Sequence, residues 1–579
     1  MIVGPRQYIA LILAALLDWI SSLDLPLVAE GRDPTWELPF GYYLRHKFQA
    51  GVDYIFTYGP FGYVLTTSYD PALYWLKYGW EVAIKLLFVA ILWKISQSFL
   101  RFRDRLFFFL FAALLSLLLP PTPDAIYVFS LLAGSIYLPG TVFGLLCGLL
   151  ALTKFTFLLL AVVLIAIVTI DRRSLYALIS FGGAFLAGWL ILGQRVDNIP
   201  RYLSTSWQIT SGYGDAMWQA GSTKELVLAL IVLLMLAVAS SRSRYAVVFA
   251  LGATGFLSFK HAFVRQDIYH AAGFFVFAAF AFILLRRSWP QKAGIALSFV
   301  ALLICQSSIS MPMLLSRWKG EAVALIRPLK LHHQLDQQYL QLERRFALPR
   351  LREIIGTGSV DVRGDQRKAI FNKLNWRPRP IFQTYSAYTP KLLAANAVFF
   401  EGTRAPEFIL ATWEERDARL PTADDGAAFL KMLAHYEPVT GEADCYLFRR
   451  MKNSRLPSPA VVREANIGER IEIPASQTAA FEIKYSVIGK LRNFFYRPAP
   501  VLLHLTLAPG EVKTYKGVPS IIGSEFLLSP LLESLNDVVN FSSGPAGKIV
   551  KSVEVEANPR WFKRKTRVTL REFALRPMR

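Results

Sequence analysis

The sequence is poor in cysteine and has few charged residues for its length. Its three cysteines, Cys147, Cys305 and Cys445, are far apart, which excludes a disulfide framework and a CxxC metal site. Charged residues make up 18% of the chain, below the share of about a quarter that globular proteins have. Internal repeats, low-complexity tracts and nucleic-acid-binding motifs are also missing from the sequence. We therefore expect neither a disulfide-rich protein nor a nucleic-acid-binding one.

Hydrophobic residues make up 54% of the 579 residues, and long apolar runs fill the part before about Pro312. The net charge is 64 − 42 = +22, and much of it lies in short clusters between these runs. This distribution is typical of the orientation signals of membrane proteins. The dense clusters are Arg101–Arg105, Asp171–Arg173, Arg242–Arg244 and Arg286–Arg287.

The apolar runs predict a polytopic α-helical membrane domain of about eleven helices, since a spanning helix needs about 20 apolar residues. A cleaved signal peptide is the alternative for the first run, but Asp18 interrupts its apolar core and no clear cleavage site follows. The runs are Tyr8–Val28, Gly79–Leu100, Leu106–Leu119, Ala125–Leu138, Thr141–Leu152, Phe155–Ile170, Leu175–Leu192, Glu225–Ser240, Tyr245–Phe259, Ala271–Leu285 and Ala293–Ser310.

The basic clusters also predict the orientation of this domain. If all the runs cross the membrane, the four clusters and Arg6 fall on one side, which the positive-inside rule assigns to the cytoplasm. The loops that hold Asp33 and Arg265, and everything after Ser310, are then external. Membrane lipids are the expected surroundings of the domain.

We predict four regions along the chain. Residues 1–312 form the membrane domain, and residues 313–352, with helical spacing of Leu, Arg, Gln and Glu, form a helical connector. Residues 353–455 form an external α/β domain that closes with the strand Tyr446–Arg450. Residues 456–579 form an external β-sandwich-like domain, because short alternating runs such as Val501–Leu507 are separated by turn residues.

The first external loop carries candidate catalytic residues. Arg32, Asp33 and Glu37 directly follow the first apolar run, and a carboxylate at the membrane surface could take a proton from a sugar hydroxyl. A helix cap or a solvated carboxylate is the alternative interpretation. Tyr58, in the turn Phe56–Leu65, could bind substrate or simply belong to the aromatic belt at the interface.

A second external segment, Phe259–His270, concentrates groups that could bind a phosphate. It contains Lys260, His261, Arg265, Asp267 and His270. Arginine binds phosphate with two parallel hydrogen bonds, although these side chains could also pair among themselves. The two histidines lack a recognisable set of further metal ligands, so we predict no metal site and no cofactor, although a divalent metal is not excluded.

Two charged residues elsewhere carry open interpretations. Lys154 is the lone charge in the apolar stretch Thr141–Ile170, where it either binds substrate or marks the outer turn between two helices. Asp124 follows a proline-rich stretch, and we interpret it as a turn residue.

Several motifs resemble integral-membrane glycosyltransferases of the GT-C type. Asp33 shortly after the first helix, the turn "TYGP" at Thr57–Pro60, and "GLLALTKFTFLLL" at Gly148–Leu160 are similar to segments of that superfamily. The segments Arg379–Phe400 and Phe526–Leu532 resemble the external part of an uncharacterised bacterial group with the same front end.

The resemblance implies a GT-C-like fold in the bacterial cytoplasmic (inner) membrane. It also implies a polyprenyl-phosphate-linked sugar as donor, and an acceptor that could be a glycan, a lipid or a protein. Asp33 would be the general base and Glu37 the weaker candidate, and the loop has no Asp-x-Asp pair for a metal.

We therefore hypothesise a glycosyltransferase that acts outside the cytoplasmic membrane. A transporter or flippase of a lipid-linked glycan is the first alternative, although the two halves show no matched broken helices. A non-catalytic envelope protein that binds polysaccharide is the second.

Overall fold

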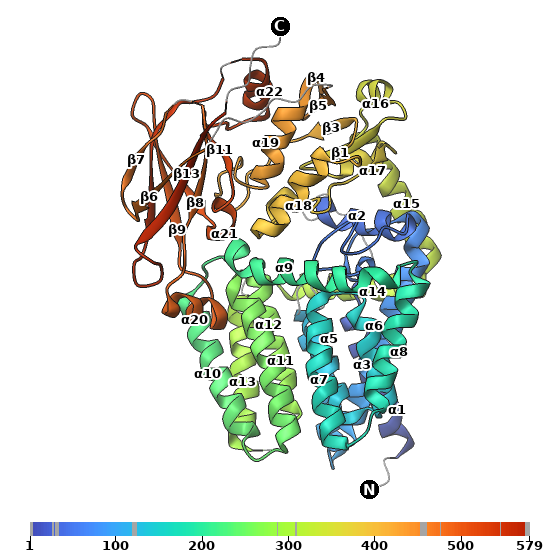
Figure 1. Ribbon diagram of the computed structural model, residues 1–579. Helices are drawn as coiled ribbons and strands as arrows, with labels where there is room; N and C mark the ends of the chain where they lie inside the picture. The colour runs from blue at the N-terminus through green and yellow to red at the C-terminus, as the bar shows by residue number, and fades with distance from the viewer. Residues whose placement is uncertain are drawn as a thin grey trace. The chain divides into compact units, whose positions relative to one another are not determined.

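The computed structural model describes residues 4–25, 28, 34–118, 124–285, 288–306, 310–451, 460–474, 476–544 and 546–573 (Figure 1). The chain forms two compact units. Unit 1 comprises Met1–Lys47, Tyr58–Val196 and Gln219–Leu340, and unit 2 comprises Phe48–Thr57, Asp197–Trp218 and Gln341–Arg579. Two short segments from the first part of the chain thus belong to the second unit, and part of the segment predicted as a connector belongs to the first.

Unit 1 is helical, and each apolar run of the sequence overlaps one of its helices. Three of these helices, α7, α10 and α11, are long and apolar enough to cross a membrane, or four if α8 and the bent segment after it form one span. The structure thus shows helices suited to a membrane, and eleven crossings stay a prediction. The helices are α1 (Pro5–Ser22), α2 (Pro34–Arg45), α3 (Tyr74–Ser96), α4 (Phe102–Leu118), α5 (Asp124–Tyr137), α6 (Gly140–Ala151), α7 (Phe155–Arg172), α8 (Tyr176–Ile191), α10 (Thr223–Ser240), α11 (Tyr245–Val264), α12 (Ile268–Ile283), α13 (Trp289–Cys305), α14 (Met311–Ile326) and α15 (Pro328–Arg345).

Small residues allow α6 and α8 to approach closely. A Cβ atom on Gly144 would lie 2.3 Å from the carbonyl oxygen of Ala177, and one on Gly148 would lie 2.6 Å from the Cβ atom of Ala184. Such glycine pairs four residues apart are characteristic of helix contacts in membranes, where close backbone packing replaces the hydrophobic driving force. Packing of α6 therefore depends on these glycines.

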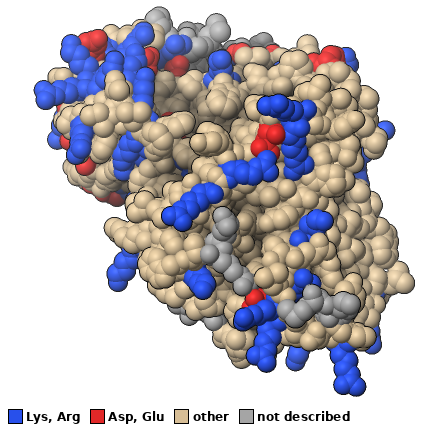
Figure 2. Space-filling model, turned by 90° about the horizontal axis from the view of Figure 1, so that it is seen from below, with Lys and Arg blue, Asp and Glu red and all other residues tan. Residues whose placement is uncertain are grey.

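One end of unit 1 holds two of the basic clusters. Arg244, before α11, forms an ion pair with Asp171 at the end of α7. Arg172 donates hydrogen bonds of 2.7 Å to the carbonyl oxygen of Leu138 and 2.6 Å to that of Ser135, at the end of α5. Figure 2 shows Lys and Arg side chains with few Asp and Glu on the face seen from below. The opposite ends of α5, α7 and α11 therefore lie together at the other end of the unit.

Unit 2 begins with a mixed α/β region. Its five-stranded sheet has the order β2-β1-β3-β5-β4, with β2, β1 and β3 parallel and β3, β5 and β4 antiparallel. Strand β5 contains the predicted strand Tyr446–Arg450. The elements are β1 (Ser359–Arg363), β2 (Asn375–Trp376), β3 (Phe408–Ala411), β4 (Tyr436–Glu442) and β5 (Cys445–Arg450), with helices α9 (Ile199–Met217), α16 (Pro349–Ile355), α17 (Arg367–Phe371), α18 (Pro390–Glu401) and α19 (Gly426–His435).

The C-terminal part of unit 2 contains two four-stranded sheets, β10-β9-β12-β7 and β11-β8-β13-β6. Both contribute side chains such as Leu503 of β9 and Phe481 of β8 to one buried core, as expected for a sandwich. Strand β9 alternates buried and partly exposed residues along its length. The elements are β6 (Ala460–Asn466), β7 (Arg470–Glu472), β8 (Gln477–Glu482), α20 (Val487–Phe495), β9 (Val501–Leu507), β10 (Val512–Gly517), α21 (Pro519–Ile522), β11 (Phe526–Ser529), α22 (Leu535–Ser543), β12 (Val550–Ala557) and β13 (Lys565–Glu572).

Candidate functional site

The break between α6 and α7 places Lys154 beside the first residue of α5. Lys154 is 9% exposed, and its Nζ forms an ion pair with Oδ2 of Asp124. A charged group among apolar helices is costly unless it is paired, and this pair satisfies both side chains. Asp124, which we expected in a turn, is therefore the first residue of α5 and the partner of the lone lysine.

The turn around Tyr58 contacts the same break. The Nζ atom of Lys154 lies 5.4 Å from the centre of the Tyr58 ring, and the backbones of the two residues pair. The amide of Gly59 donates a 2.9 Å hydrogen bond to the carbonyl oxygen of Thr153. Trp36 of α2 packs on the Tyr58 ring at a centroid distance of 5.4 Å. The turn around Tyr58 and α2 are thus fixed to the Lys154 turn.

The turn between α11 and α12 completes the group. The Nε2 atom of His261 lies 3.6 Å from Oδ2 of Asp124, and the His261 and His270 rings are 4.9 Å apart. The Nδ1 atom of His270 lies 2.7 Å from Oδ1 of Asp267, and Nε of Arg265 lies 3.5 Å from Oδ2 of the same carboxylate. Residues from four helices and three turns therefore meet at one place.

Asp267 is held as an anion at the start of α12. Its Oδ1 atom accepts hydrogen bonds from the backbone amides of Tyr269 at 3.1 Å and His270 at 3.0 Å, so it caps the helix. Burial raises the pKa of Asp267, but the hydrogen bond and the charge of His270 outweigh burial and hold the pKa below its usual value. The carboxylate can therefore orient both His270 and Arg265.

A partly open cavity lies beside this group. Asp124, His261 and His270 of the group line it together with Thr156, Ser258 and several apolar residues, whereas Lys154 and Arg265 are not among its described lining residues. The N-termini of α5, α7 and α12 end at this cavity, and each carries a partial positive charge. The cavity thus combines apolar walls with groups that can bind an anion.

Glu37 is buried, whereas a general base would have to be accessible to the substrate. It is 6% exposed, and its Oε2 accepts hydrogen bonds from the Thr67 amide at 2.8 Å, the Thr67 hydroxyl at 2.7 Å and the Ser68 hydroxyl at 3.1 Å. Burial raises the pKa of Glu37, which these bonds and the charge of Lys77 only partly offset. The arrangement suits an anchor between α2 and the segment Thr67–Ser68.

A row of buried charges on α3 went unnoticed in the sequence. Lys77, Glu81 and Lys85 are spaced four residues apart and lie on one face of the helix. The Nζ atom of Lys85 lies 3.4 Å from Oε1 of Glu81, and 5.2 Å from the centre of the Tyr127 ring of α5. The spacing of these charges within an apolar run was the signal that could have found them.

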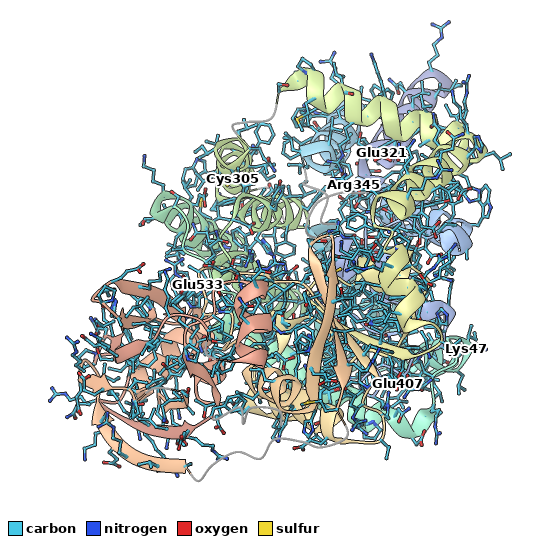
Figure 3. The ribbon with its side chains drawn as sticks, turned by 90° about the horizontal axis from the view of Figure 1, so that it is seen from above. Lys47, Cys305, Glu321, Arg345, Glu407 and Glu533 are labelled. Carbon is cyan, nitrogen blue, oxygen red and sulfur yellow. The ribbon has the colours of Figure 1, made fainter. Side chains whose placement is uncertain are left out.

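The row continues towards the segments that hold Asp24 and Thr66. The backbone amide of Asp24 donates a 3.0 Å hydrogen bond to Oε1 of Glu81, and Lys77 donates one of 3.4 Å to the hydroxyl of Thr66. Glu321 of α14, labelled in Figure 3, is close enough to Asp24 for their charges to interact. Buried charges therefore connect these segments, α3 and α5.

The described structure does not bring the remaining predicted site residues to this group. Arg32 and Asp33 lie outside the described residues. Lys260 of α11 is partly buried, and within the described part of the chain it does not line the cavity. Among the described residues, no three His, Cys, Asp or Glu side chains are grouped so that they could hold a metal ion.

Unit 2 contains a separate cluster of buried charges. Arg379, which is 1% exposed, forms ion pairs of 2.7 Å with Asp361 of β1 and 2.9 Å with Asp425 before α19. Asn396 donates a 2.8 Å hydrogen bond to Asp425 and also bonds the backbone of Ile381. This cluster connects a strand to two helices, which is a structural role.

No protein-family model and no curated protein sequence matches the chain. Among solved structures, the cryo-EM structure of the arabinofuranosyltransferase AftD from mycobacteria is similar, with a TM-score of 0.31 and 10% sequence identity. The match covers 99% of this chain and 59% of that enzyme. At this TM-score the likeness is too slight to identify the fold or the activity.

Proposed function

We propose that the protein is a membrane glycosyltransferase that takes a sugar from a polyprenyl-phosphate donor. One observation carries the proposal: the turn around Tyr58 and the segment His261–His270, far apart in the sequence, both contact the Asp124–Lys154 pair beside one cavity. By the charge of its loops, this end of unit 1 would face the outside of a bacterial cytoplasmic membrane.

The cations of the group would bind the donor phosphate. Lys154 supplies a point charge and Arg265 a planar fork of donors, and the three helix N-termini add partial positive charge. Lys154 and Arg265 are balanced by Asp124 and Asp267. A phosphate would therefore bind by replacing a carboxylate as the partner of a cation. The apolar walls would receive the first units of the polyprenyl chain.

Asp33 would be the general base. It precedes Trp36 by three residues, and Trp36 is fixed on Tyr58 beside Lys154. Asp33 would take the proton of an acceptor hydroxyl as the hydroxyl oxygen attacks the anomeric carbon of the donor sugar. The bond from that carbon to the phosphate oxygen would break, and polyprenyl phosphate would leave with the bonding electrons. Glu37 would hold the loop in position.

The test is transfer by Asp33→Asn in proteoliposomes supplied with a panel of polyprenyl-phosphate-linked monosaccharides. We expect the rate to fall by at least about a hundredfold, because a general base contributes that much or more. Binding of undecaprenyl phosphate should be kept, and Asp171→Asn at the opposite end is the matched control. Full transfer by Asp33→Asn would overturn the assignment.

The charge row of α3 favours a second candidate function. Buried ionisable groups within membrane helices often mark a transport path, so Lys77, Glu81 and Lys85 could serve a transporter of a lipid-linked glycan. Vesicles loaded with such a lipid separate the two functions. A transporter moves the lipid between leaflets without breaking a bond, whereas a transferase leaves free polyprenyl phosphate behind.

A further inference from the structure

Helix α20 exposes a row of large apolar side chains on the surface of the β-sandwich. Their spacing of one, four, seven and eight residues places them on one helix face, and each is between 53% and 76% exposed. They are Val487, Ile488, Leu491, Phe494 and Phe495. Scattered exposed apolar residues are ordinary, but five on one short helix form a patch that needs an explanation.

The opposite face of α20 is held firmly on the sandwich. A Cβ atom on Gly489 would lie 2.0 Å from the carbonyl oxygen of Trp561, so only glycine allows this approach. The Ser486 hydroxyl caps the helix by accepting a 3.0 Å hydrogen bond from the Gly489 amide. The guanidinium of Arg492 lies 5.0 Å from the centre of the Trp561 ring. The apolar face is thus fixed in an outward direction.

The charged residues within the stretch that contains α20 all have one sign. The stretch Lys484–Arg497 contains four basic residues and no acidic one. Lys484 and Lys490 are exposed. An apolar face flanked by lysine and arginine is the pattern of helices that lie in the boundary of an anionic bilayer. A protein partner would not by itself call for this pattern.

A short stretch of chain connects the helix that holds α20 to a helix that is apolar enough to cross a membrane. The hydroxyl of Tyr485 donates a 3.0 Å hydrogen bond to Oδ1 of Asp215 on α9, and Asn493 donates one of 2.5 Å to the same atom. Helix α10 begins at Thr223, eight residues after Asp215. Eight residues span at most about 28 Å, so the chain allows α20 to reach a bilayer surface at the start of α10.

We propose that α20 docks on the surface of the lipid bilayer. Its apolar face would lie in the boundary between headgroups and acyl chains, about 5–10 Å deep, with Lys484 and Lys490 on anionic lipid phosphates. The docking would hold the β-sandwich against the membrane. It goes beyond the proposed function, because it holds whether or not a sugar is transferred.

The test places an environment-sensitive fluorophore on α20 of the full-length protein. Leu491→Cys is labelled with a nitrobenzoxadiazole dye in vesicles of phosphatidylcholine and phosphatidylglycerol. Val461→Cys on β6, where Val461 is 68% exposed, is the matched control. The native cysteines are buried, and the unsubstituted protein labelled in parallel gives the background.

We expect dye emission at position 491 to shift to the blue and to be quenched severalfold more by brominated lipids than at position 461. Equal emission at both positions would overturn the proposal. So would a blue shift without quenching, since that result means that protein covers the patch. Lys490→Glu should weaken the quenching in anionic vesicles, and unchanged quenching would overturn the role given to its charge.

Discussion

Two clusters of acidic and basic side chains in this protein have similar members and different surroundings. In unit 1, Lys154 pairs with Asp124, whose side chain is 21% exposed, beside a cavity that His261 also lines. In unit 2, Arg379 pairs with Asp361 and Asp425, and the exposed side-chain fraction of all three is at most 2%. The first cluster can meet a ligand, whereas the second is closed to one.

The difference teaches that burial decides what an ion pair contributes. The two charges of a buried ion pair have lost their hydration and depend on each other. Removing one of them leaves an uncompensated buried charge, which lowers the free energy of unfolding. A pair at a cavity keeps part of its capacity to bind, because one partner can exchange its counter-ion for a ligand. Substitutions in the closed cluster should therefore change the stability of the protein, and substitutions in the open cluster should change its affinity for a ligand.

Arg379→Met should have the largest effect on stability. It leaves Asp361 and Asp425 as two buried carboxyls without their cation, at a cost of about 3–5 kcal/mol in the free energy of unfolding. Arg404→Met is the control, because the Arg404 side chain is 53% exposed and its pair with Asp53 should contribute at most about 1 kcal/mol. Thermal unfolding of the full-length protein in detergent measures both. Equal losses in the two variants would remove the distinction between buried and exposed pairs.

The open cluster should respond in ligand affinity, with a sign that depends on the partner removed. Lys154→Met should weaken binding of undecaprenyl phosphate about ten- to a hundredfold, as expected for one hydrogen bond to a charged group. Asp124→Asn should keep or raise the affinity, because Lys154 then lacks its protein counter-ion. Titration of each purified variant with undecaprenyl phosphate measures both affinities.

The double variant Asp124→Asn/Lys154→Met should bind as weakly as Lys154→Met alone. Arg244→Gln, whose side chain is 73% exposed at the opposite end of unit 1, should leave the affinity unchanged. If Asp124→Asn weakened binding as much as Lys154→Met does, the pair would be structural like the cluster around Arg379, and the comparison between the two clusters would fail.

Much of the fold could be predicted because local pattern determines it. The apolar runs became helices, and predicted strands such as Val501–Leu507 became strands of the sandwich. Membership of a unit was harder to predict, because it depends on distant contacts. Phe48–Thr57 belongs to unit 2 through bonds such as that from the Ile55 amide to the Pro380 carbonyl oxygen, 2.7 Å long, which no local pattern indicates.

Most residues of the candidate site could be predicted from the sequence, but Asp124, which pairs with Lys154, could not. The group Lys154, His261, Arg265, Asp267 and His270 was visible as charges near apolar runs, and the structure brings these residues together. We predicted Asp124 to be a turn residue. Only the folded position of the break between α6 and α7 shows that Asp124 pairs with Lys154. Any role of these residues in binding stays a prediction.

The smallest expected effect is a difference in how the two clusters respond to pH. Burial raises the pKa of Asp425 to about 6, which Arg379 only partly offsets. The folded protein then holds this proton more tightly than the unfolded chain, so the free energy of unfolding should fall as pH rises from about 4 to about 6. Asp267 should change the free energy of unfolding with pH in the opposite direction. Because its pKa is lowered, its contribution is present above the usual pKa of about 4 and is lost as pH falls below that value.

Two variants separate these contributions. Asp425→Asn should remove the loss between about pH 4 and pH 6, and Asp267→Asn should remove the gain that appears as pH rises towards about 4. The difference in Tm between each variant and the parent protein, followed against pH, measures them. Two differences that change in the same direction with pH would mean that both carboxyls respond to their cations alone. Burial would then not be what distinguishes the closed cluster from the open one.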